Sequence, residues 1–320
     1  MSVRSLPTWV PWSVAGLSIL LGFADLTRGG ITIAPILLTL GYCVAVPWAL
    51  LSGTRATGGD EPPPYRAAMV AALAVFVLYL LTLSPSTAMW DASEYIAAAY
   101  TMGLPHPPGN PLFVILGRVF SILPIAPNVA MRINLLAALS SAVAAGTWFL
   151  LAERVVHRAG LARAWRYLAG GLAALIGATA FTVWTQSVVN EKVYTVALAG
   201  IAIISWLALR WSDAPDGPRA DRLLVLIAFL LGLGYANHMA GMLPLPAVGI
   251  LVLAVRPRTL LRWRLLLAAV AALLLGMTPY ATQPIRAAYN PPINEGEPTA
   301  CREGLQLGCT FSRGTYEAFK

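Results

Sequence analysis

The chain has 320 residues, of which 58% are hydrophobic and only 11% are charged, and its mean hydropathy is +0.70. A soluble domain carries roughly 25% charged residues. This composition therefore excludes soluble enzymes, nucleic-acid-binding proteins and secreted disulfide-rich proteins, despite the net charge of +8. It predicts an all-α polytopic membrane protein.

Nine apolar segments are expected to cross the membrane, because each approaches the roughly 20 apolar residues that one helical crossing needs. The predicted spans are residues 6–23, 31–51, 67–83, 133–152, 167–189, 193–209, 223–235, 239–255 and 265–281. A further apolar segment, residues 111–125, is shorter and carries Arg118 in its middle. We expect this segment to be a helix lying at the membrane interface.

The arginine-rich loops set the expected orientation. If the N-terminus is inside, the loops that hold Arg154–Arg166 and Arg256–Arg264 are also inside, as the positive-inside rule favours. The loop at 84–132 and the tail after residue 283 are then outside. We therefore expect a multi-pass protein of a bacterial inner membrane, with its site on the periplasmic or outer face. In an oxidising periplasm, Cys301 and Cys309 of the tail could form a disulfide.

Two carboxylates, Asp91 and Glu94, follow the third predicted span. Their spacing of three puts both on one face of a helix. The same spacing is also typical of a capping box, in which the first side chain accepts backbone N–H bonds and the glutamate folds back. The two interpretations are compatible, because a capped helix start can also hold a catalytic carboxylate rigidly.

The next polar feature is His106, which lies among Pro105, Pro107 and Pro108. Prolines restrict the backbone and remove N–H donors, so this stretch is either a plain rigid connector or a stiff mount for the histidine. A histidine held in this way could donate to a phosphate or orient a substrate hydroxyl.

Three further polar positions lie beside apolar runs. Glu191 and Tyr194 belong to a short turn between two spans, and an ordinary solvated turn is the alternative to a functional one. Asn237 and His238 form the apex of a hairpin, residues 223–255, whose length of about 50 Å is less than the ~60 Å that two crossings need. The apex should therefore line a cleft, unless it makes a structural hydrogen bond between helices. Arg286, at the end of the last span, could bind an anion or snorkel.

Several motifs together resemble a family of membrane proteins whose eukaryotic relatives are protein O-mannosyltransferases, within the GT-C superfamily of polyprenyl-phosphate-sugar-dependent glycosyltransferases. They are Trp90-Asp91-x-x-Glu94-Tyr95, Gly-x-Pro-His-Pro-Pro-Gly at 103–109, Arg132-x-Asn134, Val189-x-Glu191-x-x-Tyr194, Ala236-Asn237-His238, and Arg286 with Asn290-Pro-Pro-x-Asn294. The resemblance covers roughly residues 67 to 298, and the His-Pro-Pro-Gly block is its most specific part.

The resemblance implies three regions. Residues 1–66 would be two additional helices with a cytoplasmic loop, residues 67–282 a GT-C-like module of seven helices with its catalytic loop at 84–132, and residues 283–320 an outer tail that is truncated relative to the family. In the superfamily, the carboxylate at the start of this outer loop is the catalytic one.

The implied reaction is an inverting transfer of a hexose, such as mannose, from a polyprenyl-phosphate sugar to a hydroxyl of a protein or glycan acceptor. Asp91 would be the general base, and a phosphate leaving group needs no second carboxylate as an acid. Glu94 would orient the base or the acceptor, and His106, His238 and Arg286 would hold the phosphate. Glu191, Tyr194 and Asn237 complete the expected substrate-binding set.

This chemistry requires no metal and no cofactor besides the lipid-linked sugar, and the expected partners are that sugar, its acceptor and membrane lipid, with no nucleic acid. Two alternatives stay open. In the first, the same cleft carries or flips lipid-linked sugars without reacting. In the second, the outer loops of a structural subunit dock a partner.

Overall fold

The computed structural model describes residues 7, 9–52, 61–88, 91–189, 193–295 and 306–310. Regular structure in these residues is helical, apart from one isolated parallel β-bridge between Leu104 and Asn294. Cys309 is disulfide-bonded and Cys43 is free, whereas Cys301 lies outside the described residues.

The first half of the chain forms α1 (Trp9–Thr27), α2 (Ile33–Thr39), the π-helical turn η1 (Leu40–Ala45), α3 (Val46–Leu51), α4 (Tyr65–Leu81), α5 (Ala92–Thr101), α6 (Pro111–Ile122) and α7 (Val129–Arg158). The second half forms α8 (Arg163–Thr179), α9 (Phe181–Val188), α10 (Tyr194–Asp213), α11 (Ala220–Asn237), η2 (Met239–Met242), α12 (Pro244–Val255), η3 (Pro257–Leu261), α13 (Trp263–Met277), η4 (Thr278–Ala281), α14 (Thr282–Ala288) and α15 (Leu307–Thr310).

Every predicted span coincides with a helix or a run of helices, which confirms the prediction of a polytopic all-α membrane protein. Within the described residues, six helices are long and apolar enough to cross a membrane, and the bent pair α8 and α9 makes a seventh if it is one span. The other two predicted spans, α4 and Met239–Val255, are apolar but shorter. The expected count of nine therefore includes two helices that fall below a full crossing length.

The predicted span at 167–189 is not one straight helix. It is broken between α8 and α9, which are bent by 67°. Ala180, at the break, has an extended ψ of 131°. The break could not be predicted from the sequence, because the run stays apolar and has neither glycine nor proline at the bend.

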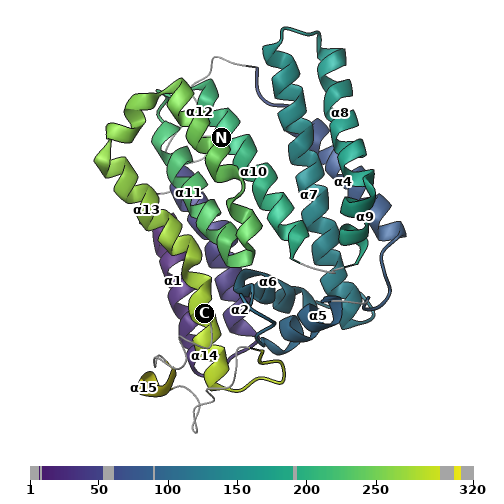
Figure 1. The fold of residues 1–320 in the computed structure, drawn as a ribbon, viewed down its shortest axis with the longest axis vertical. Helices are drawn as coiled ribbons and strands as arrows, with labels where there is room; N and C mark the ends of the chain where they lie inside the picture. The colour runs from purple at the N-terminus through teal and green to yellow at the C-terminus, as the bar shows by residue number, and fades with distance from the viewer. Residues whose placement is uncertain are drawn as a thin grey trace.

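The long helices lie side by side, and α5 and α6 lie across one end of the bundle (Figure 1). The opposite end, here called the arginine-rich end, holds the turns α7–α8, α10–α11 and α12–α13. Asp213 accepts hydrogen bonds there from Arg154 at 2.9 Å, Arg158 at 2.6 Å and Arg210 at 2.7 Å. The basic loops therefore gather at the end opposite to α5, as the orientation prediction requires.

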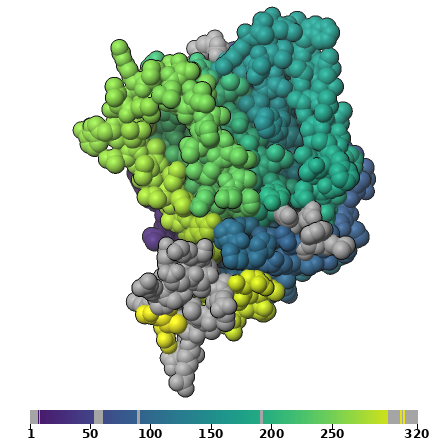
Figure 2. Space-filling model, viewed as in Figure 1, coloured from purple at the N-terminus to yellow at the C-terminus, as the bar shows by residue number. Residues whose placement is uncertain are grey.

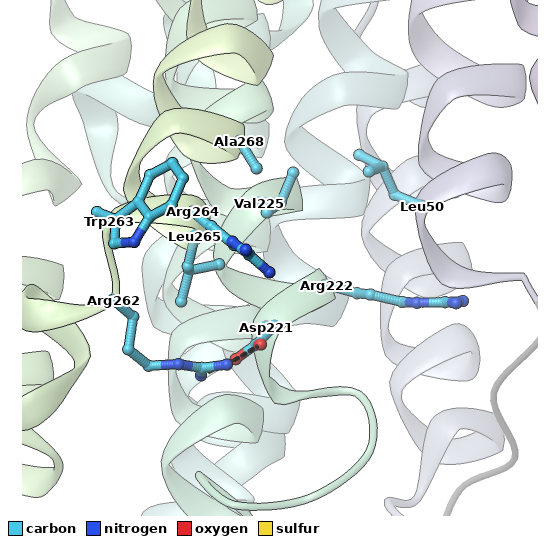
Figure 3. Close-up of a pocket in the computed structure, with 9 residues that line it drawn as sticks. All are labelled: Leu50, Asp221, Arg222, Val225, Arg262, Trp263, Arg264, Leu265 and Ala268. Carbon is cyan, nitrogen blue, oxygen red and sulfur yellow. Dashed lines mark hydrogen bonds and ion pairs between the residues drawn. The ribbon is translucent and has the colours of Figure 1, made fainter.

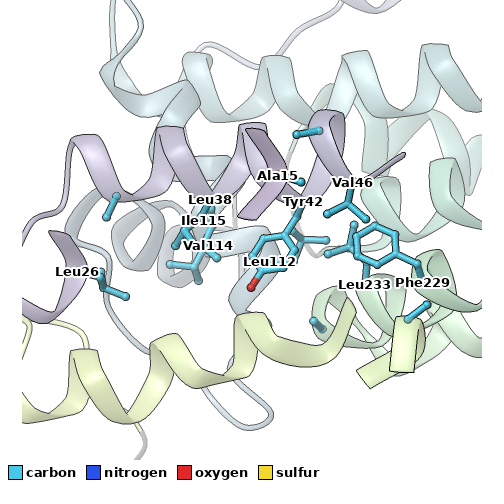
Figure 4. Packing of buried hydrophobic residues seen from close by; sticks show 14 of the residues in the cluster. Ala15, Leu26, Leu38, Tyr42, Val46, Leu112, Val114, Ile115, Phe229 and Leu233 are labelled. Atoms are coloured by element: carbon cyan, nitrogen blue, oxygen red, sulfur yellow. The ribbon is translucent and has the colours of Figure 1, made fainter. Parts of the chain in front are cut away.

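The first two membrane helices share a hydrophobic core with the rest of the bundle (Figure 4). Leu38, Tyr42 and Val46 pack in one cluster with residues of α6 and α11, among them Ile115 and Phe229. The Tyr42 hydroxyl also lies 2.6 Å from the hydroxyl of Thr278. These helices thus brace α6, the helix that follows the His106 loop.

The segment after α14 folds back onto the loop that carries His106. Leu104 donates its backbone N–H to the Ile293 carbonyl at 2.8 Å, and Glu295 donates to the Leu104 carbonyl at 2.9 Å. Figure 2 shows part of this yellow segment directly against α5 and α6. The loop that carries His106 is therefore enclosed between the bundle and the segment after α14.

Candidate active site

Asp91 occupies the N-cap position of α5, and its side chain makes no capping hydrogen bond to the helix. The carboxylate of Glu94 reaches His106 instead of folding back over the helix start. The structure therefore does not form the capping box that the spacing allowed. Both carboxylates lie on the first turn of α5, as the spacing predicted, and both are half-buried.

Glu94 and His106 are joined by two hydrogen bonds. The backbone N–H of His106 donates to Glu94 Oε1 at 2.5 Å, and His106 Nδ1 lies 2.8 Å from Glu94 Oε2. A carboxylate that accepts from both the backbone and the ring of one residue fixes the rotamer of that residue. The histidine is thereby held in place, while 42% of its side chain stays exposed to a ligand.

One ligand-type atom from each of Asp91, Glu94 and His106 lies within 4.8 Å of the others. Two carboxylates and an imidazole are groups that also suit a divalent cation. Sequence reasoning assigned these three residues to one site but did not predict the contact between Glu94 and His106, because 12 residues separate them and only the folded loop brings them together.

Tyr95 and Asn110 form the buried floor of the cluster. Asn110 donates from Nδ2 to the Tyr95 hydroxyl at 2.6 Å, and the Tyr95 ring meets the His106 ring edge-on at 5.4 Å. Burial raises the pKa of Tyr95 well above its usual value, and the nearby charges of Glu94 and Asp91 raise it further. The phenol therefore stays neutral and able to donate. Asn110 was not predicted as a site residue, and Tyr95 entered only as part of a motif.

The His-Pro-Pro-Gly block is packed against α14. Gln283 donates from Nε2 to the Pro108 carbonyl at 2.7 Å. Gly109 has a φ of +80°, and a Cβ atom there would lie 2.0 Å from the same Gln283 nitrogen. Only glycine satisfies both the left-handed backbone and the close approach. The block is thus a rigid connector that also mounts His106.

Arg286 lies beneath the other end of α5. Its Nε donates to the Met102 carbonyl at 2.8 Å, and Nη2 lies 3.4 Å from the Thr101 carbonyl. The side chain is buried, and a cation at a helix C-terminus is stabilised by the unpaired carbonyls there. The contacts that the structure gives Arg286 hold α5 in position; its binding of phosphate stays a prediction.

Asn237 and His238, at the end of α11, come together with the start of α10, where Tyr194 lies. Asn237 donates from Nδ2 to the Val193 carbonyl at 3.0 Å, which is the structural bond between helices that the sequence left open. The His238 ring meets the Tyr194 ring edge-on at 5.0 Å. Val193 packs in one buried cluster with Tyr95, so this group neighbours the residues around the two carboxylates. Glu191 lies outside the described residues.

His238 has a defined hydrogen-bonding state. Its Nδ1 accepts from the backbone N–H of Ala240 at 3.1 Å. A ring nitrogen that accepts is unprotonated, so the proton resides on Nε2. His238 therefore presents an N–H donor on the side of the ring away from its own backbone.

Two adjoining cavities lie beside Tyr194, between α7, α9 and α10, with volumes of about 260 and 190 Å³. The walls of both include Ser141, Val183 and Leu198. The larger is also lined by Tyr194, Gln186 and two threonines, whereas the smaller continues along alanines of α7 and α8. Sequence reasoning missed this path, because small apolar residues in a membrane helix carry no recognisable signal.

The structure is a bundle of membrane helices, with a carboxylate–histidine cluster on a loop across one end and an adjoining cavity between the helices. The chain is therefore a multi-pass membrane protein with its polar site at one end of the bundle. Residues 91–261, more than half of the chain, match the family described as protein O-mannosyl-transferase TMEM260 N-terminal domain. The chain belongs to this family, which confirms the resemblance inferred from the motifs.

Two relatives extend the comparison. The chain is 28% identical over 239 residues to protein O-mannosyl-transferase TMEM260 of Mus musculus, which covers 73% of this chain and 32% of the mouse protein. It is 39% identical over 70 residues to protein O-mannosyl-transferase tmem260 of Dictyostelium discoideum, covering 21% of this chain and 8% of that protein. The chain thus spans about a third of the length of the mouse relative. No solved structure matches it.

Proposed function

We propose that this chain is an inverting membrane glycosyltransferase that moves a hexose, such as mannose, from a polyprenyl-phosphate sugar to a hydroxyl of a protein. The observation that carries the proposal is the cluster of Asp91, Glu94 and His106, held on a braced loop beside a cavity between the membrane helices. The names of the two relatives support the reaction class and the protein acceptor.

In the proposed reaction, the acceptor oxygen attacks the anomeric carbon while the bond from that carbon to the phosphate oxygen breaks. The hydroxyl proton passes to the Asp91 carboxylate, and the bonding electron pair leaves with the polyprenyl phosphate. A general base of this kind contributes about 10² to 10⁴ in rate. Because a single displacement occurs at the anomeric carbon, its configuration inverts.

Glu94 has a different role from Asp91 in this proposal. Its two oxygens hold the backbone and the ring of His106. A carboxylate that is already engaged in two bonds is a poorer proton acceptor than one that faces the substrate. Glu94 is therefore a positioning residue, and His106 offers its exposed ring edge to the sugar phosphate.

The donor would enter from the lipid. The alanine-lined cavity between α7 and α8 suits an isoprenoid chain, and it adjoins the cavity beside Tyr194. The Nε2 proton of His238, next to Tyr194, could then donate to the phosphate. Glu191 and Arg286 remain proposed members of the substrate site.

The proposed orientation follows from the charge distribution. Arginines concentrate at the end of the bundle opposite to Asp91, and basic loops favour the cytoplasmic side. The reaction would therefore occur on the outer face, which is the periplasmic face in a bacterial inner membrane.

The test is a transfer assay with the purified chain, polyprenyl-phosphate [³H]mannose and an unfolded polypeptide rich in serine and threonine. We expect label on the polypeptide that β-elimination releases as mannose. Movement of intact lipid-linked sugar across vesicles without any label on the acceptor would instead support the carrier alternative. The absence of both activities would refute the proposal.

A further inference from the structure

A second cavity lies at the arginine-rich end, between α3, α11 and α13, far along the bundle from Asp91. Its volume is about 500 Å³, within the range of small-molecule sites. It is lined by Leu50, Asp221, Arg222, Val225, Arg262, Trp263, Arg264, Leu265 and Ala268 (Figure 3). The proposed transfer makes no use of it.

The charges in this cavity are unbalanced. Arg262 is paired with Asp221 through two contacts, one of them Nη2 to Oδ2 at 2.6 Å. In the part of the chain that the structure describes, no carboxylate forms an ion pair with Arg222 or Arg264. Arg222 donates to the Ser52 carbonyl, and Arg264 stacks 5.3 Å from the Trp263 ring centroid. Among the described residues, these two positive charges therefore have no carboxylate as counter-ion.

The helix ends add to this imbalance. Arg264 is in the first turn of α13, which has no acidic residue, and Arg222 is in the first turn of α11, where Asp221 is the acidic residue and pairs with Arg262. Helix N-termini carry partial positive charge and favour anions. An anion in this cavity would be stabilised by both helix N-termini.

The cavity has a polar and an apolar part. Figure 3 shows the side chains of Arg222, Arg262 and Asp221 on one side, and those of Leu50, Val225 and Ala268 on the other. The apolar part extends along α11 and α13 into the bundle, whereas the arginines lie at the helix ends. Trp263 is exposed at the boundary, where tryptophans of membrane proteins meet the lipid headgroups.

We propose that this cavity binds one anionic phospholipid from the leaflet at the arginine-rich end. The phosphate and headgroup would lie between Arg222 and Arg264, and the start of one acyl chain would cover Leu50, Val225 and Ala268. A free anion would leave these apolar walls uncovered, and a zwitterionic lipid would bring no net negative charge to the two arginines. An anionic phospholipid satisfies both parts of the cavity.

The test is native mass spectrometry of the purified full chain in detergent, titrated with phosphatidylglycerol or with phosphatidylcholine of the same acyl chains. We expect one phosphatidylglycerol to bind in preference to phosphatidylcholine. Each arginine near an anionic headgroup contributes about fivefold in affinity. The double variant Arg222→Gln/Arg264→Gln should therefore weaken phosphatidylglycerol binding about 25-fold and leave phosphatidylcholine binding unchanged.

The control is Arg258→Gln, which removes one arginine charge from an exposed position outside the cavity. It should leave the preference intact. If the double variant fails to fold, Ala268→Phe provides the second test, because it fills the apolar part and should also weaken binding.

Three results would overturn the proposal. They are equal binding of the two lipids by the wild-type chain, a loss in Arg258→Gln as large as that in the double variant, and displacement of phosphatidylglycerol by millimolar inorganic phosphate. The last would identify a site for free anions. None of these readouts depends on sugar transfer.

Discussion

Replacing Gly109 by alanine tests whether the close packing of the His-Pro-Pro-Gly block on α14 holds the site together. The new Cβ atom would lie 2.0 Å from Nε2 of Gln283, which now donates to the Pro108 carbonyl. A left-handed backbone costs a non-glycine residue about 1–2 kcal/mol. Displacing Gln283 forfeits a hydrogen bond worth about 0.5–1.5 kcal/mol. We expect a total destabilisation of about 1.5–3.5 kcal/mol.

Gly160 provides the matched control. It has a similar φ of +77°, but nothing lies within 4 Å of the position of its Cβ atom. Gly160→Ala should therefore cost only the backbone term of about 1–2 kcal/mol. Thermal unfolding in detergent should rank the wild type above Gly160→Ala and Gly160→Ala above Gly109→Ala.

The contribution of Gln283 is separated by a double-mutant cycle. Gln283→Ala removes both the clashing atom and the hydrogen bond, so adding Gly109→Ala to it should cost less than Gly109→Ala does alone. Equal unfolding temperatures for Gly109→Ala and Gly160→Ala, with additive effects in the cycle, would refute the packing that we describe.

Three further predictions concern the site and its orientation. His238→Ala should raise the KM for the lipid-linked donor more than the KM for the acceptor, because the Nε2 proton of His238 is proposed to donate to the phosphate. Steady-state kinetics with each substrate varied in turn would measure both values. A larger rise in the KM for the acceptor would show that His238 serves the acceptor instead. Transfer should persist in EDTA, since the proposed chemistry uses Asp91 as base, and loss of activity with recovery on adding Mn²⁺ or Mg²⁺ would show that the cluster holds a cation. The orientation can be tested with single cysteines at the exposed positions Thr87 and Ala159, in a chain without its own cysteines. In intact cells, an impermeant thiol reagent should label the cysteine at position 87 and not the one at 159. Labelling at 159 alone would reverse the orientation.

The sequence predicted the helices well because apolar runs dominate it. Each predicted span has its helix, and the segment expected at the membrane interface forms the helix α6. The bend between α8 and α9 was missed, because it is set by packing inside a uniformly apolar run and not by a helix-breaking residue. The two N-terminal helices were expected as an addition, yet they contribute Tyr42 to the same core as Ile115 of α6.

For the site, local spacing predicted what lies on one helix turn and failed for contacts made by chain folding. Asp91 and Glu94 share the first turn of α5, as expected from their separation. The partner of Glu94 could not be predicted, because it depends on the path of the loop to His106. Similarly, the spacing gave no sign that Arg286 would bind the carbonyls at the end of α5.

The central claim is that Asp91 removes the proton from the acceptor, and its most direct test is single-turnover transfer by Asp91→Asn. Asparagine keeps the size of the side chain but cannot act as the base, so the rate should fall by about 10² to 10⁴. The control is Asp216→Asn, an exposed carboxylate that pairs with Arg256 at the arginine-rich end and should leave the rate unchanged. Both variants should unfold at the wild-type temperature. A folded Asp91→Asn protein that transfers sugar at the wild-type rate would contradict the account.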